Sequence, residues 1–383
     1  MINQTTSRLR HLLAFWLVTT VACIWIHPSD VREYRIYADE ALKWPLLHAW
    51  PHEYPMLSLA VFLLPKILPL AYRWAFAVIT GMVLWQLMVQ THEGPAWDRR
   101  LLGYLALASV GLFAGRYDIF PAAAAFFAVM AARQGQFTRA WTWSILGFLL
   151  KLFPVVLWPG FLIAEWRATG RWRWDRLAAG IGAGVLSVAV QALFSRQAAF
   201  SSYRYFLHRP LQLGSLSAGL AALVHFGRFH LMTSFGSINV MTAPGPVVAD
   251  IVTGLSLGAV ALVLGLAVTG RIDLETTSLS LLTLLILSSK VFSAQYLIWL
   301  IPLWALYAWR WQWLAAAMLT TLGYPVSFIL AHQFGAFWLH WALWIDFCRD
   351  AMLLWGSVAW FMVRVKRTDV SSGILVPSRS LSG

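Results

Sequence analysis

Long apolar stretches are the feature that most constrains how this chain can fold. Residues 247–269 and 341–363 each approach the roughly 20 apolar residues that a helix needs to cross a bilayer. Of the 383 residues, 60% are hydrophobic and only 12% are charged, whereas soluble domains average about 45–50% and about 25%. The sequence therefore predicts an all-α fold, a polytopic bundle of transmembrane helices.

The net charge of +13 is carried by basic residues that cluster between the apolar stretches, as in residues 165–176. Basic loops of this kind usually face the cytoplasm and contact anionic lipid headgroups. The distribution favours membrane lipids as partners and argues against nucleic acid. The two cysteines, Cys23 and Cys348, lie within apolar runs, so no disulfide framework is expected.

We expect one integral membrane domain over residues 1–364 and a cytoplasmic, disordered, Ser-rich tail over residues 365–383. Arg8 and Arg10 precede the first apolar run, and no small-x-small cleavage site follows it, which favours an uncleaved signal anchor. Both chain ends would then be cytoplasmic, and residues 29–53 would lie outside. The predicted location is the cell membrane, with several crossings.

The spacing of basic loops predicts helices that are too short to cross the membrane. Only about 25 residues separate the loops at residues 133–139 and 165–176, whereas two full crossings need about 40. The simplest solution is a short or re-entrant pair of helices with Lys151 at its tip and Pro154 at the break. Such half-depth backbone is tolerated where protein or a cavity surrounds it.

The same arithmetic predicts two further hairpins, with tips at residues 115–118 and 290–296. Together they give about twelve membrane segments, including short re-entrant pairs. The tips would be raised to the extracytoplasmic side, where residues 29–53 and the aromatic, polar residues 195–246 supply outer-face loops for a site.

Charged side chains in these apolar regions need a hydrated environment. An ionisable group near the bilayer centre costs roughly 2.5–3.5 kcal/mol, so we expect Arg116, Asp118, Lys151 and Lys290 to converge on a cavity. The alternative is that each basic residue merely marks the end of a segment. Cations at outer tips oppose the positive-inside trend, however, and together with Arg209 they would suit a phosphate.

Asp30 follows the first apolar helix and has two possible roles. It can cap a short following helix, or it can act as a general base that removes a proton from an attacking hydroxyl. Glu53 is the next candidate, because the step from Tyr54 to Pro55 holds the chain extended at the start of an apolar helix.

A metal site is conceivable at His48, His52 and Glu53, but Pro51 interrupts the helix and no fourth ligand is apparent. We therefore predict no metal and no cofactor. The chain also lacks a Gly-rich nucleotide loop, a Gly-x-Ser-x-Gly elbow and a Cys-x-x-Cys pair in a credible context, which disfavours nucleotide-driven and serine-hydrolase mechanisms.

Short strings along the chain form a recognisable series. After Asp30 come Tyr34-x-x-Tyr37-Ala38, Glu53-Tyr-Pro, Gly115-Arg-Tyr-Asp, Lys151-Leu-Phe-Pro, Arg209-Pro-Leu-Gln, Gly236-Ser-Ile-Asn-Val and Lys290-Val-Phe-Ser-x-Gln-Tyr. In this order they resemble glycosyltransferase family 87, the polyprenol-phosphate-mannose-dependent mannosyltransferases of the C-type integral membrane superfamily. The resemblance covers roughly residues 8–309. Met56, Gly214 and Ala294 depart from the family pattern, and the change at Gly214 bears on donor or acceptor contacts.

The resemblance implies transfer of a sugar, mannose in this family, from a polyprenyl-phosphate donor to a lipid-linked or glycan acceptor outside the cytoplasmic membrane. It implies that Asp30 is the catalytic base. The expected substrate-binding residues are Tyr34, Tyr37, Glu53, Tyr54, Arg116, Asp118, Lys151, His208, Arg209, Gln212, Lys290, Gln295 and Tyr296.

Two other functions stay open from the sequence. A transporter or flippase of a polyprenyl-linked sugar would use the same cation-lined cavity, although it would need polar groups through the whole bilayer depth. A non-catalytic partner in an envelope-glycan complex would have lost activity, and the presence of Asp30 argues against that.

Overall fold

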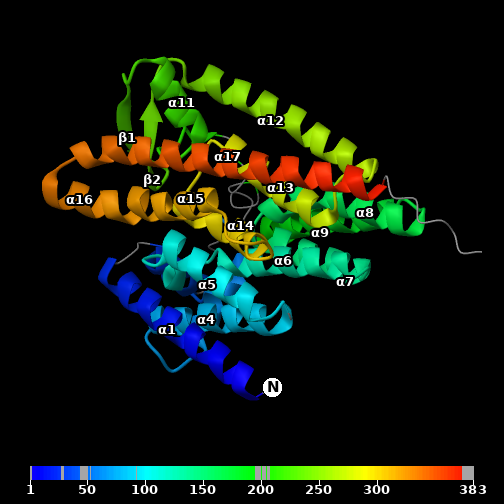
Figure 1. Ribbon diagram of the computed structural model, residues 1–383. Helices are drawn as coiled ribbons and strands as arrows, with labels where there is room; N and C mark the ends of the chain where they lie inside the picture. Colours follow the sequence, from blue (N-terminus) through cyan, green and yellow to red (C-terminus); the bar gives the residue numbers. More distant parts are fainter. Residues whose placement is uncertain are drawn as a thin grey trace, which may run out of the picture.

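The computed structural model describes residues 2–26, 30–43, 51, 53–91, 93–194, 200, 204 and 208–372. Within these ranges the chain is mostly helical, with a single β-hairpin (Figure 1). The helices are α1 (Ile2–Ile26), α2 (Asp30–Ala41), α3 (Ser58–Leu63), α4 (Tyr72–Thr91), α5 (Pro95–Ser109), α6 (Ile119–Arg133), α7 (Phe137–Leu150), α8 (Trp158–Thr169), α9 (Trp174–Phe194), α11 (Leu216–Val224), α12 (Gly245–Val268), α13 (Leu274–Ser288), α14 (Leu297–Trp304), α15 (Trp311–Thr321), α16 (Ser327–Phe334) and α17 (Phe337–Ser372).

Five helical stretches in the described part of the chain are long and apolar enough to cross a membrane. They are Thr6–Ile26, Tyr72–Thr91, Trp174–Phe194, Gly245–Val268 and Trp311–Phe334. The expected helical fold is confirmed, and these five helices agree with the expectation of a membrane protein. The count of about twelve segments stays a prediction, because many of the remaining helices are short.

The helix α17 differs from these five. Residues 341–363, expected to form a crossing, lie within it, but they also contain Asp346, Arg349 and Asp350. The helix continues to Ser372, so the start of the tail that we expected to be disordered from residue 365 is helical. Residues 373–383 lie outside the described part of the chain.

The chain leaves the helical conformation at each of the three tips expected from the sequence. Arg116 has extended backbone between a short 3₁₀ turn and α6. Lys151 is extended directly after α7, and a 3₁₀ helix containing Pro154 follows it. The third break lies between α13 and a 3₁₀ turn at Ala294–Tyr296. Such breaks free backbone groups and turn side chains away from the helix axes.

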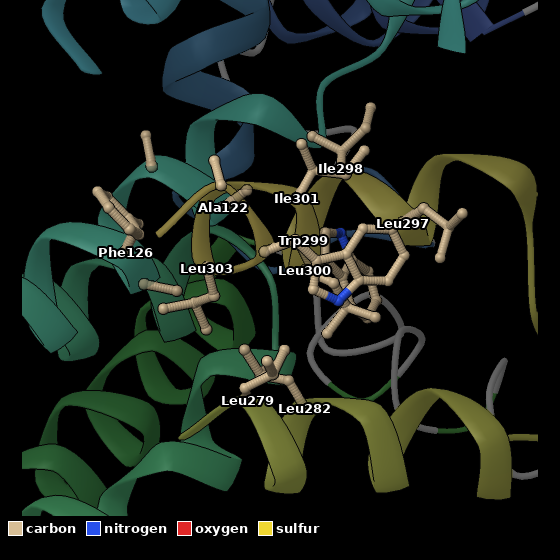
Figure 2. Packing of buried hydrophobic residues seen from close by; sticks show 14 of the residues in the cluster. Ala122, Phe126, Leu279, Leu282, Leu297, Ile298, Trp299, Leu300, Ile301 and Leu303 are labelled. Carbon is tan, nitrogen blue, oxygen red and sulfur yellow. The ribbon is translucent and has the colours of Figure 1, made fainter. Parts of the chain in front are cut away.

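The core is built around α14, whose side chains lie between α6 and α13 (Figure 2). Leu297, Leu300 and Ile301 on α14 are completely buried. The facing helix α6 is rich in alanine, with Ala122–Ala125 all nearly inaccessible. Small residues let helix backbones approach closely, which matters in a membrane where lipid is as apolar as leucine. This packing fixes the breaks that flank α6 and α14.

The β-hairpin was not expected from the sequence. Its strands, β1 (His230–Ser234) and β2 (Ser237–Met241), pair antiparallel and are joined through Phe235 and Gly236, both with positive φ. The preceding segment joins it as well, because Leu213 N donates to Ile238 O and Val240 N donates to Leu211 O. In Figure 1 the hairpin lies beside α11, at the end of the molecule away from α1.

Candidate functional site

A cavity of about 380 Å³ gathers residues from distant parts of the chain. Its lining residues include, in chain order, Asp30, Glu53, Tyr54, Arg116, Lys151, Arg209, Gln212, Gly214, Phe235, Phe292, Gln295, Tyr296, Tyr324, Asp346 and Arg349. The helix breaks, the hairpin turn and the middle of α17 thus meet at one place. Both acidic and basic groups face this cavity, so it is suited to a polar or charged ligand.

Asp30 and Arg116 form an ion pair on the cavity wall. Asp30 is the first residue of α2, and its Oδ1 lies 2.5 Å from Nη1 of Arg116. The Arg116 side chain is 8% exposed and the Asp30 side chain 23%. The guanidinium carbon of Arg116 also lies over the ring of Tyr324, 6.0 Å from the ring centroid. The guanidinium therefore fixes the orientation of the Asp30 carboxylate while leaving that carboxylate at the cavity surface.

Lys151 is held by a buried carboxylate and a group of aromatic rings. Its Nζ donates to Oδ1 of Asp118 at 2.6 Å, and Trp299 Nε1 donates to the same oxygen at 2.7 Å. The ammonium lies 5.1–5.9 Å from the ring centroids of Trp299, Tyr296 and Tyr54, within the range of cation–π attraction. Asp118 is 1% exposed and does not line the cavity. Its role is therefore to position Lys151.

An aromatic cluster supports Tyr54 from behind. Tyr34 is 1% exposed, stacks on Phe62 at 4.5 Å, and has its hydroxyl 3.5 Å from that of Tyr54. Tyr37 packs against the same cluster. Burial raises the pKa of Tyr34 and of Tyr54 well above the ordinary value, so both phenols are neutral at physiological pH. Tyr54 reaches the cavity, whereas Tyr34 and Tyr37 do not line it.

The segment around Gln212 joins the hairpin to the third helix break. The backbone N–H of Gln212 donates to Lys290 O at 2.9 Å, and its side-chain Nε2 donates to Ser293 Oγ at 3.0 Å. Gln212 also bridges to Asn239 on β2. Asn239 is completely buried and donates to Ser234 O. These contacts hold Gln212 and the hairpin turn against the cavity.

A charged cluster on α17 completes the wall and was not predicted as part of the site. Arg349 is 1% exposed and donates to Asp346 Oδ1 at 2.9 Å and to Asp350 Oδ1 at 2.8 Å. It also donates to Gly214 O, and its guanidinium carbon lies 3.7 Å from the ring centroid of Phe292. Asp346 and Arg349 line the cavity, whereas Asp350 does not.

The expected site residues divide into two groups. Those that line the cavity are Asp30, Glu53, Tyr54, Arg116, Lys151, Arg209, Gln212, Gln295 and Tyr296. Those that do not line it are Tyr34, Tyr37, Asp118, His208 and Lys290. Lys290 and His208 are exposed residues, so Lys290 does not share the cavity with Arg116, Lys151 and Arg209.

The departure at Gly214 has a structural counterpart. A Cβ at Gly214, if present, would lie 3.1 Å from Oδ2 of Asp346. It would also lie 2.5 Å from the carbonyl oxygen of Phe292. A carboxylate from α17 therefore occupies the space beside the glycine.

The described residues contain no cluster that could form the metal site considered from the sequence. No group of three or more His, Cys, Asp or Glu side chains with ligand geometry occurs among them. His48 and His52 lie outside the described part of the chain.

Comparison with known proteins returned no match, neither to a family model nor to a curated protein. The functional argument therefore rests on the cavity and on the order of the sequence motifs.

Proposed function

We propose that this protein is a membrane glycosyltransferase that moves a sugar from a polyprenyl-phosphate donor to a hydroxyl of a lipid-linked or glycan acceptor. The observation that carries the proposal is the meeting of Asp30, Arg116, Lys151 and Arg209 around one cavity. These residues come from four separate segments, and their types are those that the transfer needs: one base, and cations for a departing phosphate.

In the proposed reaction the acceptor oxygen attacks the anomeric carbon of the donor sugar, and the bond from that carbon to the phosphate oxygen breaks. Asp30 takes the proton of the acceptor hydroxyl. The polyprenyl phosphate leaves with the bonding electron pair, and Lys151 and Arg209 stabilise its charge. A single displacement of this kind inverts the anomeric configuration. Fixed charges and alignment supply most of the catalysis, because the phosphate is already a fair leaving group.

The resemblance supplies the finer parts of the proposal. Mannose is the proposed sugar, and the extracytoplasmic side of the cell membrane is the proposed location of the cavity. The proposed topology has about twelve membrane segments, in which α5–α6, α7–α8 and α13–α14 form short re-entrant pairs. The helix breaks between these partners are what support it.

The decisive experiment replaces Asp30 by Asn in the purified full-length protein, reconstituted with polyprenyl-phosphate mannose and a membrane lipid extract as acceptor source. We expect transfer to fall by about 10²–10⁴-fold, the usual contribution of a positioned base. Asp39→Asn is the matched control, because Asp39 lies on the same helix and pairs with Lys66 away from the cavity. That variant should transfer at the wild-type rate.

Loss of the ion pair with Arg116 is a separate effect of Asp30→Asn, and a second variant isolates it. Arg116→Gln breaks the same pair but keeps the carboxylate. A catalytic base predicts that Asp30→Asn lowers transfer by about 10²–10⁴-fold, whereas Arg116→Gln, which keeps the carboxylate, lowers it much less. Near-normal transfer by folded Asp30→Asn would overturn the proposed mechanism. Movement of the donor across the bilayer without transfer, unaffected by Asp30→Asn, would instead favour a flippase.

A further inference from the structure

Asp346 is a third carboxylate at the cavity, on a different element from Asp30 and Glu53. It lies in the middle of α17, is 5% exposed, and is among the residues that line the cavity. Its Oδ1 accepts from Arg349 Nη1 at 2.9 Å. The hydrogen bond and ion pair found for Asp346 among the described residues both involve Oδ1, and neither involves Oδ2. The carboxylate is almost buried and lines the cavity, and only one of its two oxygens is hydrogen-bonded within the protein. The other oxygen can therefore accept a hydrogen bond from a ligand.

Arg349, Gly323 and Gly214 together determine the position of the Asp346 carboxylate. Arg349 is itself fixed by Asp350, by the carbonyl oxygen of Gly214 and by the ring of Phe292. A Cβ at Gly323 would overlap Asp346 Oδ1, so the absence of a side chain there makes room for the carboxylate. Gly214 leaves similar room beside Oδ2. Because these contacts fix the Asp346 carboxylate before a ligand binds, it needs little reorganisation on binding. Low reorganisation favours selective recognition.

The charge of Asp346 indicates which part of a sugar phosphate it would contact. A carboxylate repels a phosphate and accepts hydrogen bonds from hydroxyl groups. Four cations line the cavity. Arg349 on α17 is paired with Asp346 and Asp350, and Arg116 is paired with Asp30. Lys151 and Arg209 come from other segments and suit the phosphate. The sugar ring, which carries only hydroxyl donors, is the part that fits beside Asp346.

We propose that Asp346, positioned by Arg349, binds a hydroxyl of the transferred sugar and so determines which sugar the protein accepts. This inference rests on the proposed glycosyltransferase function. It adds a specificity-determining residue on α17, outside the segments that carry the sequence motifs.

Asp350 provides a matched control within the same cluster. Both carboxylates bond to Arg349, and both are buried, but only Asp346 lines the cavity. Replacing either one by Asn leaves Arg349 with one carboxylate partner, so neither variant leaves the buried guanidinium without a counter-charge. A purely structural role for Asp346 predicts that the two variants behave alike.

The experiment measures kcat/KM for polyprenyl-phosphate mannose and for a panel of monodeoxy analogues, each lacking one sugar hydroxyl. With the wild-type protein, one analogue should be poorer than the parent donor by roughly 10- to 100-fold, the effect of losing a hydrogen bond to a charged group. In Asp346→Asn that ratio should shrink to a few-fold, because the charged acceptor is gone. In Asp350→Asn it should stay at the wild-type value.

The outcomes separate the two proposals. Unchanged ratios for every analogue in a folded, active Asp346→Asn variant would overturn the role of Asp346 and leave the glycosyltransferase proposal intact. Equal changes in Asp346→Asn and Asp350→Asn would also overturn it, since they would indicate a general distortion of the cluster. Absence of transfer by the wild-type protein itself would refute the proposed function instead.

Discussion

The buried pair between Lys151 and Asp118 makes a quantitative prediction about stability. Asp118 is 1% exposed and the Lys151 side chain 12%, and their atoms are 2.6 Å apart. Removing one partner of such a pair leaves an uncompensated buried charge, which costs about 3–5 kcal/mol. We therefore expect Asp118→Asn and Lys151→Met each to lower the free energy of unfolding by about 3 kcal/mol or more.

The double variant should lose less free energy of unfolding than the two single variants lose in sum. Asp118→Asn combined with Lys151→Met leaves neither charge of the pair buried. The oxygen of the new amide can still accept from Trp299 Nε1, which donates to Asp118 in the wild type. The coupling energy should reach about 2 kcal/mol or more, within the range seen for residues in contact. The measurement is reversible unfolding in mixed micelles, followed by tryptophan fluorescence, for the wild type, both singles and the double.

The pair formed by Asp39 and Lys66 is the control for this cycle. Their side chains are 39% and 30% exposed, and exposed pairs contribute at most about 1 kcal/mol. Asp39→Asn with Lys66→Met should therefore show little coupling. If the energies of Asp118→Asn and Lys151→Met add to within about 0.5 kcal/mol in the double variant, the two charges do not stabilise each other and the argument from burial fails.

Two further predictions concern the cations and the topology. Arg209→Ala should weaken use of the donor, which would be measured as a raised apparent KM. Lys290→Ala should have a much smaller effect, because Lys290 is exposed and does not line the cavity. Equal effects of the two substitutions would contradict this prediction. In a cysteine-free background, Lys290→Cys should react with an impermeant thiol reagent from outside the cell and Arg171→Cys only from the cytoplasmic side. The reverse pattern would invert the proposed orientation.

The meeting of Arg116 and Lys151 at the cavity could be predicted from the sequence, because a charge within an apolar run is costly in lipid. A charged residue in an apolar run must find a polar environment whatever the fold, so several such residues tend to share one. The helix breaks were accessible for a similar reason, since basic loops limit the length of chain between them. The first argument uses local composition and the second uses distances along the chain, and the sequence contains both.

The sequence could not predict the direction in which a side chain at a helix break points. Lys290 belongs to the same string as Gln295 and Tyr296, yet those two line the cavity and Lys290 is exposed. Tyr34 and Tyr54 were expected in one role, and packing places only Tyr54 at the cavity surface. Such differences depend on a few backbone dihedral angles and on neighbouring side chains from distant segments.

The cluster on α17 could have been found from sequence. Residues 341–363 were treated as a bilayer-spanning run on their average hydropathy, although Asp346, Arg349 and Asp350 lie within them. The cost of burying those charges applies there as it does at Lys151. The hairpin gave a weaker signal, because its turn is Phe235-Gly236 rather than the Asn-Gly or Asp-Gly typical of tight turns.

Lys151 and Arg116 are each paired with a carboxylate of the protein, and this bears on how an anionic donor would bind. Lys151 pairs with Asp118, which does not line the cavity, so a phosphate can approach Lys151 without displacing its carboxylate. Arg116 pairs with Asp30, which does line it. A phosphate that reached Arg116 would compete with Asp30 for the guanidinium and release a carboxylate oxygen. On the proposed mechanism, donor binding would then expose the base at the moment when an acceptor hydroxyl needs it, and the ion pair would restrain Asp30 in the absence of donor.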